Sequence, residues 1–362
     1  MTITTRKAVM SGLAGLGVVA LLAGCGQAPE SAGGGGSDGE AIDYLPCIVS
    51  DSGGFDDKSF NQSSYEGLVK AADDLGIEEK HVESASEADF GPNITSLVDQ
   101  GCDLIITVGF LLADATKEAA EKNPDVNFLI LDDNSIEADN VKPMIFDTAQ
   151  AAFLAGYAAA DTSETGKVGT FGGMQIPTVT IFMDGYADGV AYYNEQKDTD
   201  VQVVGWDVDA QQGQFTGGFD ANETAKQTAT SIINQGVDVL LPVGGPIFLS
   251  GIEAIKDSGE DIAMIGVDAD LYETADSDNE MFLTSIMKQM SDGVYNIVTS
   301  AAKDGEFDAT PYVGTLENEG VGLAPFHDWE DKVSDSLQGE LDEIKAGIID
   351  GSIDVTSPSS PK

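Results

Sequence analysis

The side chains best suited to chemistry follow a series of short apolar runs in the sequence. They are carboxylates, amides, aromatic rings and glycines, with no histidine and almost no base among them. Carboxylates and amides form hydrogen bonds with polar ligands, aromatic faces stack on flat groups, and glycine lets other groups approach the backbone. These residue types suit the binding of a small polar ligand. They occupy positions 51–61, Gly109-Phe110, Asp132-Asp133, Gly172-Gly173, Trp206-Asp207, Gly244-Gly245 and Asp268 with Asp270.

No catalytic motif is complete in this sequence. The two histidines, His81 and His327, lie outside any nucleophile motif, and no strand–Gly-x-Ser-x-Gly–helix elbow is predicted. No P-loop is present, and no Gly-x-Gly-x-x-Gly turn opens a predicted helix. The pairs Asp207/Asp209 and Asp268/Asp270 resemble parts of a calcium loop but lack its glycine and distal glutamate. We therefore predict no metal, no cofactor and no enzymatic activity.

The apolar runs themselves predict secondary structure. Short runs bounded by Gly, Pro or Asp are typical of buried parallel strands, and the apolar residues from Tyr65 to Leu75 recur at helical spacing. Residues 59–62 (SFNQ) have the form of a capping box, which predicts a helix that begins near Phe60. The predicted strands are Leu45–Val49, Leu104–Val108, Phe128–Leu131, Lys167–Phe171, Val201–Trp206, Val237–Val243, Ile262–Val267 and Phe282–Ile286; later helices are Val179–Tyr193, Glu223–Gln235, Phe248–Asp257 and Ser334–Ile349.

Two successive sets of alternating strands and helices indicate an α/β protein with two doubly wound lobes. Ligands bind to such sheets at the carboxyl ends of the strands, where the polar residues described above lie. A length of 362 residues also suits two domains. The formal net charge of −46 excludes nucleic acids and anionic lipid surfaces as partners, because both would be repelled.

The N-terminus predicts secretion and a lipid anchor. Arg6 and Lys7 precede an apolar run from Val9 to Ala23, in the order of a secretory signal. The run ends in LAGC at residues 22–25, which resembles a bacterial lipobox. We expect residues 1–24 to be removed, Cys25 to be acylated, and the Gly- and Ser-rich residues 25–42 to form a flexible tether. The protein would then sit on the extracytoplasmic face of the cell membrane; the alternative is an ordinary signal with an accidental cysteine.

Two cysteines remain after Cys25. Cys47 lies in the first apolar run, and Cys102 directly precedes the second. Neighbouring parallel strands would bring them within bonding range, and outside the cytoplasm one disulfide is then possible. Two buried free thiols are the alternative.

Residues 51–62 (DSGGFDDKSFNQ) resemble the opening signature of the basic membrane protein family. This family comprises lipoprotein substrate-binding components of ABC transporters and includes purine nucleoside receptors. The resemblance continues, in order, through Val108–Phe110, Phe128–Asp132, Gly236–Val239, Gly266–Asp268 and Leu283–Lys288. It implies a type I periplasmic-binding-protein fold, with a ligand in the cleft between two lobes. Lobe 1 would comprise residues 43–163 plus about 288–325, and lobe 2 would comprise residues 164–287 plus the C-terminal segment.

The resemblance also assigns roles to individual residues. Phe60 and Phe219 would sandwich a purine base, with Trp206 as an alternative to Phe219. The other assigned residues are Asn61 and Asp132 at the base edge, Asp51, Asp268 and Lys288 at the ribose hydroxyls, and Gly244 or Gly245 for close backbone approach.

The function expected from this resemblance is capture of a nucleoside, with a purine base preferred, for an ABC permease and its ATPase. The protein is expected to be a monomer that touches the membrane only through its lipid. The alternatives are a binding lipoprotein that senses a nucleoside or sugar for a signalling partner, a transport protein for a sugar, and an extracytoplasmic nucleoside-processing enzyme.

Overall fold

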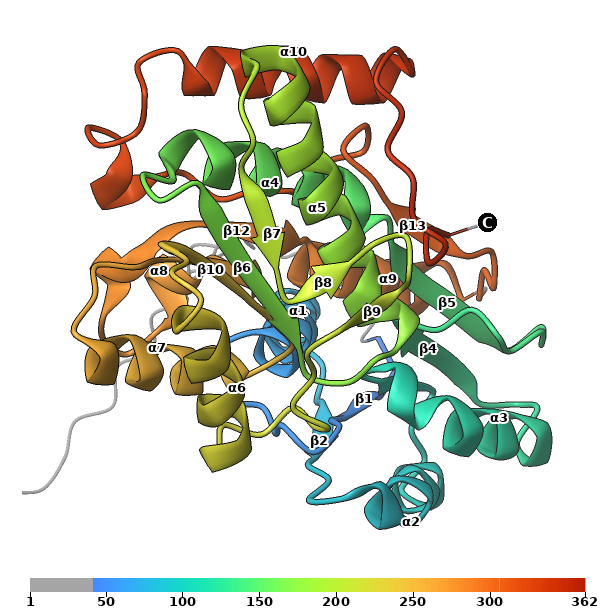
Figure 1. The fold of residues 1–362 in the computed structure, drawn as a ribbon. Coiled ribbons are helices and arrows are strands. Elements are labelled where there is room, and N and C mark those ends of the chain that lie inside the picture. The colour runs from blue at the N-terminus through green and yellow to red at the C-terminus, as the bar shows by residue number, and fades with distance from the viewer. Residues whose placement is uncertain (1–41, 306, 362) are drawn as a thin grey trace, which may run out of the picture. The chain divides into compact units, whose positions relative to one another are not determined.

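Two six-stranded sheets organise the chain (Figure 1). The computed structural model describes residues 42–305 and 307–361, which belong to one compact unit that starts at Ile42. The predicted signal peptide, the acylated Cys25 and nearly all of the tether lie outside the described residues. Within the described residues, no helix is both long enough and apolar enough to cross a membrane.

The first sheet has the strand order β2–β1–β3–β4–β5–β13, and all its pairs are parallel. Strands β1, β3 and most of β4 are buried along their length, which explains why the sequence shows continuous apolar runs there. The strands are β1 (Pro46–Val49), β2 (Lys80–Val82), β3 (Leu104–Thr107), β4 (Asn127–Leu131), β5 (Val141–Phe146) and β13 (Tyr312–Gly314).

The second sheet has the order β7–β6–β10–β11–β12–β14, and only β14 is antiparallel to its neighbour. A two-stranded ribbon of β8 and β9 follows β7 along the chain. The strands are β6 (Lys167–Gly172), β7 (Gln202–Val204), β8 (Trp206–Asp207), β9 (Gln212–Gly213), β10 (Val239–Val243), β11 (Ala263–Asp268), β12 (Phe282–Lys288) and β14 (Val321–Leu323).

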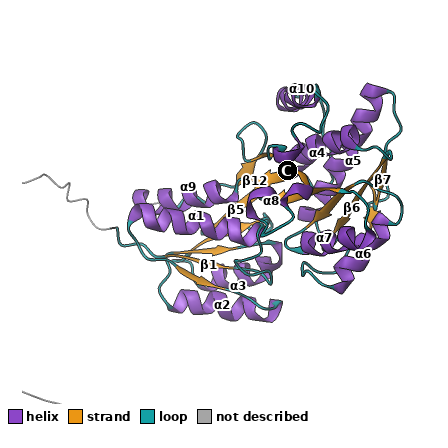
Figure 2. Cartoon of the chain, turned by 90° about the vertical axis from the view of Figure 1, so that its left-hand side faces the viewer, coloured by secondary structure: helices purple, strands orange, loops and turns teal. Residues whose placement is uncertain are grey.

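Helices cover both faces of each sheet (Figure 2). On the first sheet, α1 (Phe60–Leu75) packs beside α9 (Met290–Asp304), and α2 (Glu87–Asp99) beside α3 (Ala113–Lys122). On the second sheet the pairs are α4 (Thr148–Thr162) with α5 (Pro177–Lys197), and α6 (Glu223–Ile233) with α7 (Ile247–Ser258). The remaining helices are α8 (Leu271–Thr274), α10 (Leu337–Asp350), η1 (Phe110–Leu112), η2 (Asn279–Met281) and η3 (His327–Trp329).

The strand order reverses once in each sheet, between β1 and β3 and between β6 and β10. At such a switch point the connections leave to opposite faces, so a crevice opens at the carboxyl ends of the two strands. The predicted class of two doubly wound α/β lobes is confirmed.

The chain crosses between the sheets after β5, after β12 and between β13 and β14. The approximate boundary expected at residue 163 lies at the end of α4, and α4 packs on α5 and on β12 of the second sheet. The expected return segment 288–325 also mixes the two lobes, since β14 within it pairs with β12. Helix α4 is almost entirely buried, and its apolar surface does not reveal which sheet it covers.

A disulfide joins Cys47 and Cys102, whose Cα atoms are 6.0 Å apart. Cys47 lies on β1 and Cys102 precedes β3, its parallel neighbour. The bond therefore ties the loop before β3 to the strand whose carboxyl end carries Asp51.

Candidate functional site

A cavity lies at the two switch points. Every residue that the resemblance assigned to the ligand lines this cavity, except the alternative Trp206. The lining is Asp51, Gly53, Asp57, Phe60, Asn61, Gly109, Phe110, Leu111, Asp132, Ile176, Thr178, Val179, Phe182, Phe219, Val243, Gly244, Gly245, Pro246, Asp268 and Lys288.

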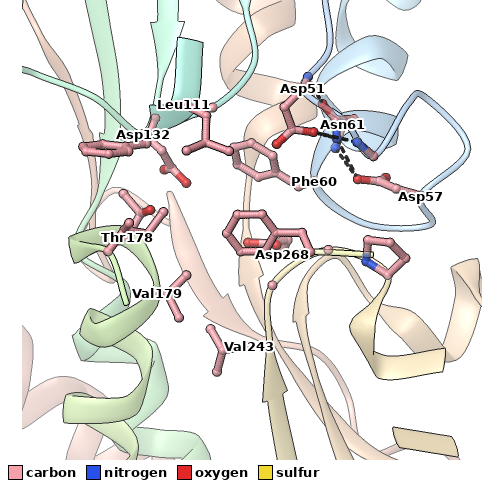
Figure 3. Close-up of a pocket in the computed structure, with 18 of the residues that line it drawn as sticks. Asp51, Asp57, Phe60, Asn61, Leu111, Asp132, Thr178, Val179, Val243 and Asp268 are labelled. Atoms are coloured by element: carbon pink, nitrogen blue, oxygen red, sulfur yellow. Dashed lines mark hydrogen bonds between the residues drawn. The ribbon is translucent and has the colours of Figure 1, made fainter. Parts of the chain in front are cut away.

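Asp51, Asp57 and Asn61 form a hydrogen-bonded network at one end of the cavity (Figure 3). Nδ2 of Asn61 donates to Oδ1 of Asp51 over 2.7 Å and to Oδ2 of Asp57 over 3.0 Å. Oδ1 of Asn61 accepts from the backbone N–H of Asp51 over 3.3 Å. The N–H of Gly53 donates to Oδ1 of Asp51 over 3.0 Å. Both donors of the Asn61 amide are thus occupied inside the protein, and the bonds from Asn61 and Gly53 fix the orientation of the Asp51 carboxylate.

The same network explains how helix α1 begins. The carboxylate of Asp57 accepts from the N–H groups of Ser59, Asn61 and Gln62 over 3.0, 2.9 and 3.0 Å. It thereby satisfies donors that would otherwise have no partner at the helix start. The predicted helix start is confirmed. The predicted capping box is wrong, because the Ser59 hydroxyl donates instead to the carbonyl of Val267 over 3.0 Å.

The ammonium group of Lys288 lies between two carboxylates. Its Nζ donates to Oδ2 of Asp132 over 2.6 Å and lies 3.4 Å from Oδ1 of Asp268. The side chains of Lys288, Asp132 and Asp268 are only 3%, 9% and 6% exposed. Among the described residues, Oδ1 of Asp268 accepts no hydrogen bond of good geometry, and its nearest donor is the ammonium group of Lys288. A ligand hydroxyl at this place would therefore find a buried acceptor.

Strand ends place these three groups. Asp132 directly follows β4, Asp268 ends β11, and Lys288 ends β12. Both aspartates adopt the left-handed conformation, with φ of 60° and 71°. Aspartate tolerates this region better than most residues. The chain turns sharply at both positions, and both side chains line the cavity.

Phe60 and Phe219 supply aromatic surface from different lobes. Phe60 is the first residue of α1, and its ring centroid lies 5.0 Å from Nζ of Lys288. Phe219 lies on the long connection between β9 and α6. This connection is held along β6, where the N–H groups of Thr216 and Gly217 donate to the carbonyls of residues 172 and 173.

Two glycines make room for the Phe219 ring. A Cβ atom on Gly173 would lie 2.4 Å from the ring, and one on Gly244 would lie 2.6 Å from it. Gly244 was expected to let a ligand approach the backbone, but here its missing side chain is the space that the Phe219 ring occupies. Gly245 faces less crowded space, because a Cβ atom there would lie 3.8 Å from the nearest atom of Phe219.

Trp206 does not line the cavity. Its side chain is buried, its Nε1 donates to Oδ1 of Asp184 over 2.9 Å, and its ring meets Phe215 edge-on. Of the two aromatic candidates, the structure brings Phe219 to the cavity.

The polar residues are grouped differently from the roles implied by the resemblance. Those roles joined Asn61 with Asp132, and Asp51 with Asp268 and Lys288. In the structure Asn61 contacts Asp51, whereas Asp132 contacts Lys288. Figure 3 shows Asn61 and Asp132 at opposite ends of the cavity. Distance along the chain does not reveal which strand ends lie side by side.

Three further lining residues come from the first turns of α5. Thr178, Val179 and Phe182 face the cavity, and the ring centroid of Phe182 lies 5.2 Å from Nζ of Lys288. In the sequence they look like ordinary residues of a core helix. No local signal distinguishes them, because their position depends on how α5 packs beneath the cavity.

Burial changes the acidity of the cavity residues. It raises the pKa of Asp51 from 3.8 to about 6, against the opposing hydrogen bonds from Gly53 and Asn61. Burial likewise raises the pKa of Asp268 to about 6, although the charge of Lys288 opposes it. For Lys288, burial acts to lower the pKa, but the carboxylates of Asp132 and Asp268 outweigh it and the pKa is raised. Lys288 is therefore a cation at neutral pH.

The sequence has clear relatives. Residues 46–357 match the family described as ABC transporter substrate-binding protein PnrA-like (Bmp). An ABC transporter nucleoside-binding protein, BmpA, of Lactococcus lactis is 32% identical, and the alignment covers 94% of this chain and 96% of the relative. Basic membrane protein A of Borreliella burgdorferi is also 32% identical, with 90% and 91% covered.

A solved structure shares the fold. The solute-binding protein of an ABC transporter system from Aeropyrum pernix superimposes with a TM-score of 0.77 at 26% identity, covering 87% of this chain and 94% of that one. Proteins of this kind are a non-enzymatic class that binds a small molecule outside the cytoplasm and works with an ABC transporter. This chain belongs to the Bmp family of PnrA-like ABC transporter substrate-binding proteins.

Proposed function

We propose that this protein captures a purine nucleoside and delivers it to an ABC permease with its ATPase. One observation carries the proposal: a single cavity combines two phenylalanine rings with a hydrogen-bonded carboxylate at one end and a lysine between two carboxylates at the other. A nucleoside presents matching groups in the same order: a polar base edge, a flat aromatic ring and a sugar with hydroxyl groups. The Lactococcus relative is, by name, a nucleoside-binding protein.

In this proposal the base stacks on Phe60 and Phe219. Its N–H groups donate to the Asp51 carboxylate, which the Asn61 amide holds in place. The ribose hydroxyls donate to Asp268, whose Oδ1 is buried and accepts no well-formed hydrogen bond among the described residues. Lys288 donates to the ribose oxygens. Asp51 and Asp268 thus bind directly, and Asn61 acts by positioning Asp51.

The charges of the cavity favour a neutral ligand. Asp51, Asp57, Asp132 and Asp268 bring four carboxyl groups, and Lys288 is the only cation among the lining residues. A 5′-phosphate carries close to two negative charges. One unpaired like-charge contact at ~4 Å costs about 4 kcal/mol at an effective dielectric of ~20, which is about a thousandfold in affinity. We therefore expect nucleosides to bind and their monophosphates to be rejected.

Calorimetry with adenosine, inosine and the matching monophosphates tests this proposal directly. Mass spectrometry of small molecules that co-purify with the protein provides an unbiased second measurement. Equal or tighter binding of a monophosphate would contradict the site. Binding of a free sugar without any nucleoside would favour a sugar carrier, and release of free base from inosine would favour an enzyme.

We further propose that the protein is held at the membrane through Cys25, which lies outside the described residues. Changing Cys25→Ser in the native host should release the protein from the membrane fraction while leaving its affinity for nucleosides unchanged. Retention of the serine variant in the membrane fraction would refute a lipid anchor at Cys25.

A further inference from the structure

A second cavity adjoins the first. The two cavities share Phe110, Asp132, Thr178 and Lys288 as lining residues. Figure 3 shows Asp132 and Thr178 at the end of the first cavity that lies opposite Asp51 and Asn61. The second cavity therefore continues from the end at which the proposed function places the sugar.

The C-terminal tail forms one wall of this second cavity, through Ser359, Ser360 and Pro361. Hydrogen bonds hold the tail in place. The hydroxyl of Ser357 donates to Oδ2 of Asp184 over 2.6 Å, and that of Ser360 donates to Oδ1 of Asp147 over 2.9 Å. The tail is thus fixed both to α5 and to the residue that precedes α4.

The lining of the second cavity offers unused hydrogen-bonding capacity. The Thr148 side chain is fully buried, and its Oγ1 has no partner among the described residues. A buried hydroxyl without a partner is costly, so a polar guest would be favoured there. Asp133, 5% exposed, adds a carboxylate that disfavours an anionic guest. Ile145 and Phe146 supply apolar surface beside these groups.

We infer that the second cavity is a subsite for a neutral, hydroxyl-bearing substituent on the sugar end of the ligand. The inference rests on the proposed function, because it requires the ribose to lie beside Lys288 and Asp132. A substituent on the 5′ carbon then points away from the base and enters the second cavity. The ligands of this protein would include nucleosides extended at this position.

The test compares adenosine with two neutral 5′-thioethers, 5′-deoxy-5′-(methylthio)adenosine and 5′-deoxy-5′-(2-hydroxyethylthio)adenosine. Both thioethers should bind within about tenfold of adenosine, and the hydroxyethyl compound about threefold to tenfold more tightly than the methyl compound, by the strength of one hydrogen bond. Calorimetry on the full-length protein gives the three affinities.

The variant Thr148→Val keeps the size of the side chain and removes its hydroxyl. It should abolish the preference for the hydroxyethyl over the methyl compound. Thr162→Val is the matched control on the same helix, because the Thr162 hydroxyl donates to the Ala158 carbonyl at the other end of α4. The control should retain the preference.

Two results would overturn the inference while the nucleoside proposal stands. In the first, adenosine binds but both thioethers bind more than about tenfold more weakly, which would mean that the second cavity does not receive the 5′ end. In the second, Thr148→Val still prefers the hydroxyethyl compound to the methyl compound. The second cavity would then hold only water. If adenosine itself does not bind, the proposed function and this inference both fail.

Discussion

The two ends of the ligand cavity are built in different ways. The Asp51 end comes from a single stretch of eleven residues, and its hydrogen bonds join Asp51, Asp57 and Asn61 within that stretch. The Lys288 end comes from three strand ends that are far apart in the sequence, at positions 132, 268 and 288. One end is a local structure, and the other exists only after the chain has folded.

The two ends also differ in how they connect the lobes. Asp51 follows β1 and Asn61 lies on α1, so both belong to the first sheet and its helices. Asp132 follows β4 of the first sheet, whereas Lys288 ends β12 of the second, so their ion pair joins the two lobes. A substitution at the Lys288 end should therefore affect both folding and ligand affinity, and one at the Asp51 end should mainly affect affinity.

The largest effect is expected from Lys288→Met. Removing the cation leaves Asp132 and Asp268 buried without a charge partner, which should lower the free energy of unfolding by about 3–5 kcal/mol. Denaturant unfolding of the variant measures the loss. Adding Asp132→Asn and Asp268→Asn to the variant should recover much of it, because the uncompensated charges are then gone.

Lys226→Met is the control for this substitution. Lys226 also pairs with two carboxylates, those of Glu253 and Asp257, but their side chains are 67% and 70% exposed. Its loss should lower the free energy of unfolding much less than Lys288→Met does, because solvent screens an exposed ion pair. Similar losses in the two variants would show that the buried position of Lys288 has no special importance for stability.

An intermediate effect is expected from Phe219→Ala and Phe60→Ala. Removing one stacking ring should weaken adenosine binding by about 1–3 kcal/mol, which is about fivefold to 150-fold, measured by calorimetry. The fold should tolerate Phe219→Ala, because this ring is only partly buried.

Trp206→Leu separates stacking from core packing. Trp206 is buried and hydrogen-bonded to Asp184, so this variant should be less stable but bind adenosine with nearly unchanged affinity. A large loss of affinity in Trp206→Leu, with none in Phe219→Ala, would reverse the two assignments.

The smallest effect concerns pH. In the folded protein Asp51 and Asp268 hold their protons more tightly than in the unfolded chain, with pKa values of about 6 against 3.8. Protonation therefore favours folding, and these two groups should make the protein more stable as the pH falls from about 6 towards 4.

Affinity should change in the opposite direction, because the ligand donates to the ionised carboxylates. Each carboxylate that must be ionised for binding should lower the affinity for adenosine by about tenfold between pH 7 and pH 5. The variants Asp51→Asn and Asp268→Asn should each remove one part of this dependence. An affinity that is constant from pH 7 to pH 5 would show that neither ionised carboxylate accepts from the ligand.

Much of the architecture could be predicted from the sequence. The buried strands β1, β3, β4, β6, β10 and β11 were evident because each is a short apolar run bounded by glycine, proline or aspartate. The start of α1 was evident from its polar signature, although Asp57 and not Ser59 satisfies its first N–H groups. In contrast, β2, β5, β13 and β14 were not predicted, since short or mixed strands carry too little pattern to be recognised.

The sequence by itself thus determined the fold class, the family and the set of strand ends from which a ligand site could be made. It could do so because strands, helix starts and turns depend on residues that are adjacent in the chain. Only the tertiary structure decided that Phe219 and not Trp206 reaches the cavity, that α4 belongs with the second sheet, and that Asp132 pairs with Lys288. These outcomes depend on which strand ends become neighbours when the sheets form and pack, and no local pattern carries that information.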